Sequence, residues 1–103
     1  MIFYFLQTSI SCPEAYEIYI DGGTHIGNIV VRYGIVSLEL FNDEQRVYII
    51  EEFEDSFKGN LTEEERDEYF DEIVSILGSK VNTNEISTYR IENSIEELLD
   101  KIS

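Results

Sequence analysis

The chain contains 103 residues, a length typical of one domain built around a single core. It has 22 acidic and 7 basic residues, and the formal charge of -15 excludes a protein that binds nucleic acid by neutralising its phosphates. The same charge argues against docking on an anionic membrane. Hydrophobic residues make up 43% of the chain, which is enough for a core, so the acidity does not predict disorder. We therefore expect a single folded, very acidic domain over residues 1–103.

The single cysteine, Cys12, cannot form a disulfide within the chain, and this favours a reducing compartment. The N-terminal segment 1–6 is apolar, but it lacks basic residues and is too short for a signal peptide or a membrane helix. We interpret it as a buried strand. The expected location is the cytoplasm, or the host cytoplasm if the protein is viral.

The first half of the chain is rich in β-branched and aromatic residues, which favour strands. Turns are predicted at Asp21–Thr24, Tyr33–Gly34 and 42–45, and such short connections require antiparallel neighbours. Alternation within one strand predicts that Val36, Leu38 and Leu40 face the core. The predicted strands are Ile2–Gln7, Tyr16–Ile20, Ile26–Tyr33, Ile35–Phe41 and Arg46–Glu51.

The second half begins with a helix signal. Thr62 and Glu65 have the spacing of a capping box, so we expect a helix from about Glu63 with Gly78 as its C-terminal stop. Apolar residues follow at helical spacing and predict a stripe that packs on the sheet, namely Phe70, Ile73, Val74 and Leu77.

After a further predicted strand at Ile86–Glu92, a second capping box at Ser94 and Glu97 predicts a short final helix. Together these elements predict an α+β fold: an antiparallel β-meander of five to six strands packed against two helices in the C-terminal half. We expect both helices to cover the same face of the sheet.

The negative charge is concentrated in one segment. Residues 51–72 contribute -9 of the total -15. The side of the predicted helix opposite its apolar stripe carries what we call the acidic ridge, which consists of Glu64, Asp67, Glu68, Asp71 and Glu72. The preceding loop adds more acids, interleaved with aromatics: Glu51, Glu52, Phe53, Glu54, Asp55 and Phe57.

Two interpretations of the acidic ridge are open. In the first interpretation, the ridge is a solvated face that keeps the protein soluble, and the helix dipole favours the acids in the first turn. Alternatively, its negative field has a function. Like charges four residues apart, such as Glu64 and Glu68, destabilise a helix, and Arg66 is the only base between Thr62 and Ser79. This imbalance favours a functional field.

The chain resembles, in physical type, the small phage-encoded inhibitors of restriction or CRISPR nucleases, which are short, acidic, α+β and without catalytic residues. That resemblance implies an anti-defence function as a DNA or RNA mimic. The expected partner is a basic, nucleic-acid-binding protein, with no direct contact to nucleic acid or membrane. We expect the partner to contact the ridge, the acidic loop and three aromatic anchors at Phe53, Phe57 and Tyr69. Phe53 and Phe57 could equally fold back as core.

Two other functions remain open. An immunity or antitoxin protein would cover a basic toxin enzyme with the same carboxylates and aromatics. A small structural protein could instead form a homodimer through a sheet edge, such as the N-terminal strand Ile2–Gln7.

Catalysis is not predicted. The lone histidine, His25, is not placed beside Cys12, and the chain has neither a calcium-binding loop of the EF-hand type nor a histidine–cysteine cluster. We therefore expect a protein that is not an enzyme, with no cofactor and no metal.

Overall fold

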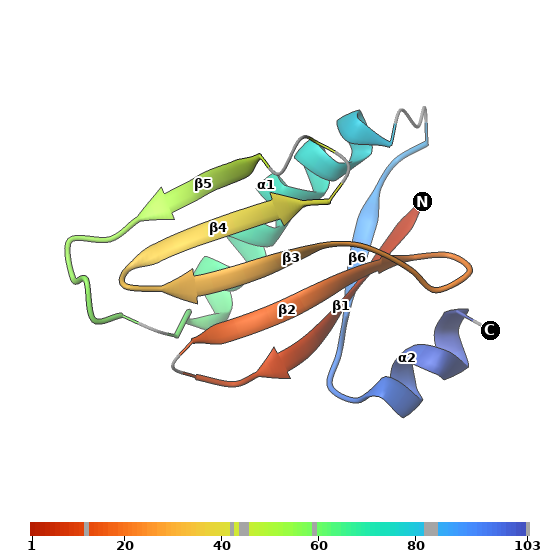
Figure 1. Cartoon of the computed structure of the whole chain (residues 1–103), viewed down its shortest axis with the longest axis horizontal. Helices are drawn as coiled ribbons and strands as arrows, with labels where there is room; N and C mark the ends of the chain where they lie inside the picture. The colour runs from red at the N-terminus through yellow and green to blue at the C-terminus, as the bar shows by residue number, and fades with distance from the viewer. Residues whose placement is uncertain (12, 42, 44–45, 59, 82–84, 103) are drawn as a thin grey trace.

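The computed structural model describes residues 1–11, 13–41, 43, 46–58, 60–81 and 85–102. A six-stranded sheet with the order β5-β4-β3-β2-β1-β6 and two helices confirm the predicted α+β fold (Figure 1). No helix in these ranges is long and apolar enough to cross a membrane. The elements are β1 (Ile2–Ser9), β2 (Glu14–Ile20), β3 (Thr24–Arg32), β4 (Ile35–Leu40), β5 (Val47–Glu52), α1 (Glu63–Lys80), β6 (Thr88–Glu92) and α2 (Ile95–Ile102).

The first five strands form the predicted antiparallel meander, in which each strand pairs with the next in sequence. Tyr33 and Gly34 join β3 to β4 with φ angles of 55° and 74°, both positive as a two-residue hairpin turn of type I′ requires. Gly22 and Gly23, with φ angles of 88° and 83°, lie in the turn between β2 and β3. The predicted turn at 42–45 lies largely outside the described residues.

The sixth strand departs from the meander. β6 lies parallel to β1, with Phe5 opposite Ile91, because α1 intervenes and returns the chain across the sheet. β1 is thus hydrogen-bonded on both sides, to β2 and to β6. The prediction that Ile2–Gln7 offers an edge for a homodimer is therefore wrong, since the edges of the described sheet are β5 and β6.

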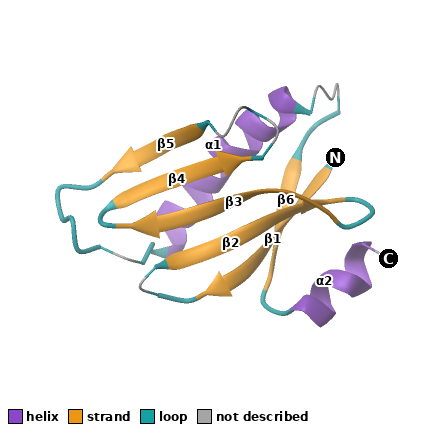
Figure 2. Cartoon of the chain, viewed as in Figure 1, coloured by secondary structure: helices purple, strands orange, loops and turns teal. Residues whose placement is uncertain are grey.

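The main core lies between the sheet and α1. Phe70 places its ring edge-on against Phe5 and Tyr16, with both centroid distances at 5.0 Å. The predicted inward residues of β4 are confirmed, since Val36, Leu38 and Leu40 are all buried. The long axis of α1 runs behind the sheet, across β3 and β4 (Figure 2).

The second helix covers the opposite face, so the prediction that both helices share one face is wrong. Successive residues of a strand point to opposite faces. Phe5 of β1 therefore joins the core under α1, whereas Tyr4 and Leu6 pack with Leu98 of α2. All of Phe3–Leu6 is buried because both faces of β1 are covered, one by each helix.

The helix caps follow the predicted chemistry with two differences. The complete capping box of Thr62 and Glu65 begins α1. The helix passes Gly78 and ends at Lys80, so the predicted stop is wrong, and the amide of Val81 still donates to the carbonyl of Leu77. At α2, the hydroxyl of Ser94 accepts a hydrogen bond from the backbone amide of Glu97, as predicted. The carboxylate of Glu97, however, accepts its hydrogen bond from the backbone amide of Asn93 and not from that of Ser94.

The docking of α2 can be tested with two adjacent leucines. Leu98 is 1% exposed and Leu99 is 52% exposed. Leu98→Ala should lower the free energy of unfolding by about 2–5 kcal/mol, because it empties the contact with Tyr4 and Leu6. Leu99→Ala should change it by less than about 0.5–1 kcal/mol. Urea unfolding followed by circular dichroism measures both, and equal effects would contradict the packing described for α2.

Candidate functional site

The acidic ridge lies on the solvent side of α1. All five of its carboxylates are on exposed residues, while the buried residues of the helix, including Phe70 and Leu77, face the sheet. Asp67 accepts a hydrogen bond from the hydroxyl of Tyr89 at 3.1 Å, which marks the side of the ridge nearest β6. Burial and this bond raise the pKa of Tyr89 to about 12.

The basic residues near the ridge are turned away from it. The guanidinium of Arg66 reaches the buried hydroxyl of Tyr16, and this hydrogen bond raises the pKa of Arg66. The ammonium of Lys58 pairs with Glu65 at 2.8 Å and lies 4.8 Å from the ring centroid of Phe53. These two are the basic residues of the segment 51–72. None of the ion pairs among the described residues joins a base to a carboxylate of the ridge, although the negative charge of Asp67 helps to raise the pKa of Arg66.

A buried carboxylate fixes the rotation of α1. Glu14 of β2 is 3% exposed and accepts from the Tyr16 hydroxyl at 2.5 Å and from the Leu61 amide at 2.8 Å. Burial and this contact with Glu14 raise the pKa of Tyr16. Arg66 adds a positive charge to the same cluster. The residues just before and within the first turns of α1 are thereby tied to the sheet, so the opposite face of the helix points to solvent.

Two of the three predicted aromatic anchors belong to the core. Tyr69 is 8% exposed, packs with Val31 and Val36, and has its ring centroid 5.9 Å from that of Phe53. Phe53 is half-buried against the same cluster, as its alternative interpretation predicted.

Four carboxylates surround Tyr69. Burial raises its pKa most, and these negative charges raise it further. The charges come from Glu51 on β5 and from Glu65, Glu68 and Glu72 on α1. The fold therefore joins one end of the acidic loop to the ridge.

Phe57, by contrast, is 93% exposed, so the interpretation of this residue as core is wrong. Its amide donates to Oδ1 of Asp55 at 2.9 Å, and it lies in a stretch whose neighbours Glu54 and Asp55 are also exposed. Glu52 is exposed at the end of β5. The structure also exposes Tyr33, at 73%, a residue predicted at the end of a strand and in the following turn but not as a partner contact.

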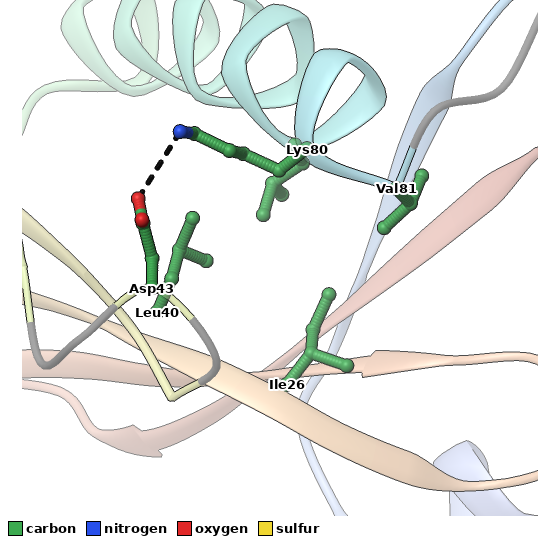
Figure 3. Close-up of a pocket in the computed structure, with 6 residues that line it drawn as sticks. Ile26, Leu40, Asp43, Lys80 and Val81 are labelled. Carbon is green, nitrogen blue, oxygen red and sulfur yellow. Dashed lines mark ion pairs between the residues drawn. The ribbon is translucent and has the colours of Figure 1, made fainter.

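A small pocket lies away from the acidic ridge, at the C-terminal end of α1. The ammonium of Lys80 lies 3.2 Å from a carboxylate oxygen of Asp43. Figure 3 shows this ion pair beside the pocket. A hydrogen bond from the Tyr48 hydroxyl, together with Lys80, lowers the pKa of Asp43. The pocket volume of about 150 Å³ is below the range of ordinary ligand sites. Its lining residues are Ile26, Leu40, Asp43, Leu77, Lys80 and Val81.

The described residues contain no group of three or more histidine, cysteine, aspartate or glutamate side chains that could hold a metal ion. The ring of His25 lies between those of Tyr19 and Phe41, at centroid distances of 4.9 and 4.8 Å. Its Nε2 is 2.9 Å from Oδ1 of Asn28. Cys12 lies outside the described residues, so its relation to His25 is not described.

Comparisons of the chain with models of protein families, with curated proteins and with solved structures find no match. The interpretation of the surface therefore depends on its residues and their geometry. What that surface offers chemically is a dense row of exposed carboxylates on one helix, with the exposed ring of Phe57 on the loop before it.

The repulsion along the ridge predicts a stability effect. Glu68 lies four residues from both Glu64 and Glu72. Glu68→Gln removes both repulsions and should raise the free energy of unfolding by about 0.4–1 kcal/mol at low salt. This gain in the free energy of unfolding should largely disappear in about 1 M NaCl, because salt screens exposed charges.

The matched control for this experiment is Glu63→Gln in the first turn of α1, where the helix dipole favours a carboxylate. Its substitution should leave the stability unchanged or slightly reduced. Urea unfolding at low and high salt measures both variants. A Glu68→Gln protein no more stable than the Glu63→Gln protein at low salt would contradict the uncompensated charge described for the ridge.

Proposed function

We propose that the protein is a non-enzymatic inhibitor that occupies the basic groove of a nucleic-acid-binding protein, such as a nuclease, by imitating the charge of the nucleic acid. The observation that carries this proposal is the exposed acidic ridge, whose carboxylates take part in none of the described ion pairs, while Lys58 pairs with Glu65 and Arg66 reaches Tyr16.

The spacing of the ridge supports mimicry. From Glu64 to Glu72 the helix advances about 12 Å, at 1.5 Å per residue. One strand of duplex DNA carries about four phosphates over that length, at about 3.4 Å per phosphate. The ridge places five carboxylates in the same length, namely Glu64, Asp67, Glu68, Asp71 and Glu72. Its linear charge density therefore matches or exceeds that of one nucleic-acid strand.

The net charge of -15 supports a partner of opposite sign over a second copy of the chain. Two such molecules repel one another, whereas a basic groove attracts the protein over several ångströms and speeds association. The encounter should be fast and sensitive to salt.

A second candidate is an immunity-type protein that occludes a basic toxin enzyme. The exposed ring of Phe57 favours it, because a toxin surface with an apolar pocket would use such an anchor. The two candidates share their electrostatics and differ in whether nucleic acid competes for the same surface of the partner.

The proposal is tested by recovering the partner from the native host with the immobilised protein at low and high salt. We expect a basic protein that is released by salt and by added duplex DNA. A partner that DNA does not displace would overturn mimicry and favour the immunity-type candidate.

A pair of matched variants separates the ridge from overall charge. The ridge variant combines Glu64→Gln, Glu68→Gln, Asp71→Asn and Glu72→Gln. The control removes the same number of charges from exposed positions elsewhere, through Asp21→Asn, Glu39→Gln, Glu96→Gln and Asp100→Asn. The ridge variant should weaken binding of the recovered partner by at least about tenfold, equivalent to about 1.4 kcal/mol, and the control should weaken it much less. Equal losses would show that only net charge matters.

A further inference from the structure

Two exposed aromatic residues, Tyr33 and Phe57, project from adjoining segments at one end of the molecule. The amide of Gly34 donates to the carbonyl of Lys58 at 3.2 Å, and the amide of Phe53 donates to the carbonyl of Gly34 at 2.7 Å. A Cβ on Gly34 would lie 2.6 Å from the carbonyl oxygen of Asp55. The turn between β3 and β4 is therefore in backbone contact with the loop between β5 and α1, as Figure 1 also shows.

Neither aromatic side chain is explained by folding. Tyr33 is 73% exposed and Phe57 is 93% exposed, so neither ring contributes much to the core. Tyr33 also has a φ of 55°, in the left-handed region, where a side chain of this kind is unfavourable and where asparagine or glycine would form the turn more easily. A strained backbone that displays an aromatic ring to solvent is typical of binding sites.

The loop that carries Phe57 is held in place before any partner binds. Asp55 accepts hydrogen bonds from the amides of Phe57, at 2.9 Å, and of Lys58, at 3.2 Å. The side chain of Lys58 then ties the loop to Glu65 in the first turn of α1. Because these contacts already hold the segment 55–58, its binding would require less further loss of conformational entropy.

The charges around these rings define the chemistry of the occupant. Glu54 and Asp55 are exposed on the same loop, Glu52 is exposed at the end of β5 just before it, and Lys58 is already paired. One base at this end, Arg32 next to Tyr33, is also exposed. An aromatic face flanked by carboxylates suits a guanidinium, which stacks on the ring and donates to carboxylate oxygens in a planar fork. An ammonium gains less from such a site because it cannot stack or form the bidentate pair.

The fold already holds cations of both kinds against aromatic rings beside carboxylates. The ammonium of Lys58, which pairs with Glu65, lies 4.8 Å from the ring centroid of Phe53. The guanidinium carbon of Arg46 lies 4.8 Å from the ring centroid of Tyr48, whose hydroxyl binds Asp43. We propose that Tyr33 and Phe57, with the carboxylates of Glu52, Glu54 and Asp55, bind arginine side chains on the basic surface of the partner protein. This inference rests on the proposed function and deepens it, because it assigns an arginine-selective contact beside the non-selective acidic ridge.

The experiment uses two probes of equal length and charge, a nine-residue oligoarginine and a nine-residue oligolysine, titrated into the whole protein by calorimetry in 150 mM NaCl. Two stacked guanidinium groups should make oligoarginine bind roughly 5–30-fold more tightly than oligolysine. The double variant Tyr33→Asn/Phe57→Ser should reduce this ratio to within about twofold while leaving oligolysine affinity unchanged. Tyr33→Asn keeps a residue that tolerates the positive φ, so the turn should persist.

Matched controls keep the two proposals apart. Ile86→Ser removes an equally exposed apolar side chain, also at 93%, and should leave the ratio unchanged. The ridge variant should weaken both peptides alike. If the wild-type protein shows no preference for oligoarginine, or if the aromatic double variant keeps it, the arginine site is overturned while the ridge proposal stands. If instead the ridge variant binds oligolysine as tightly as the wild type, the proposed function fails.

Discussion

The buried carboxylate of Glu14 ties the sheet to the first turns of α1, and the direction in which the acidic ridge points depends on it. A carboxylate at 3% exposure is strongly unfavourable unless its oxygens are satisfied. The Tyr16 hydroxyl and the Leu61 amide occupy both oxygens, and Arg66 supplies the opposite charge nearby. The same cluster thus stabilises a buried group of β2 and removes the central base of α1 from the solvent face.

Core packing holds this arrangement against the repulsion along the ridge. Carboxylates four residues apart cost a few tenths of a kcal/mol per pair, whereas the ring of Phe70 contacts Phe5, Tyr16 and Tyr89 in the centre of the core. Burial of one such side chain contributes about 1.5–3 kcal/mol and offsets several repulsive pairs. A charged surface that weakens its own helix is therefore compatible with a stable fold, as is common where a surface serves binding.

The proposed surface combines two kinds of recognition with different ranges. Charges on the ridge act over several ångströms and set the rate of encounter and its dependence on salt. Exposed rings act only at contact, where they exclude water and favour groups that stack. Because the loop of Phe57 is tied to Glu65 at the start of α1 through Lys58, the surfaces proposed for the two kinds of recognition adjoin one another.

The sequence by itself determined the fold class, the strand pairing of the meander, the N-terminal cap of α1 and the position of the negative charge. Each of these depends on local features: residue periodicity, turn chemistry and the composition of one segment. The exposure of the ridge followed from the helical spacing of Phe70, Ile73 and Leu77, which fixes the opposite face without knowledge of the neighbours.

Tertiary structure alone decided the remaining features, because they depend on contacts between residues far apart in the chain. After α1, the chain returns as β6 and pairs with β1, which makes β1 an interior strand. The burial of Tyr4 and Leu6 required α2 on the second face of the sheet. Periodicity describes one element at a time and cannot say which other element will cover each of its faces. For the same reason, only the packed fold could separate Phe53, a core residue, from Phe57 four positions later, and place Tyr33 in the adjoining turn.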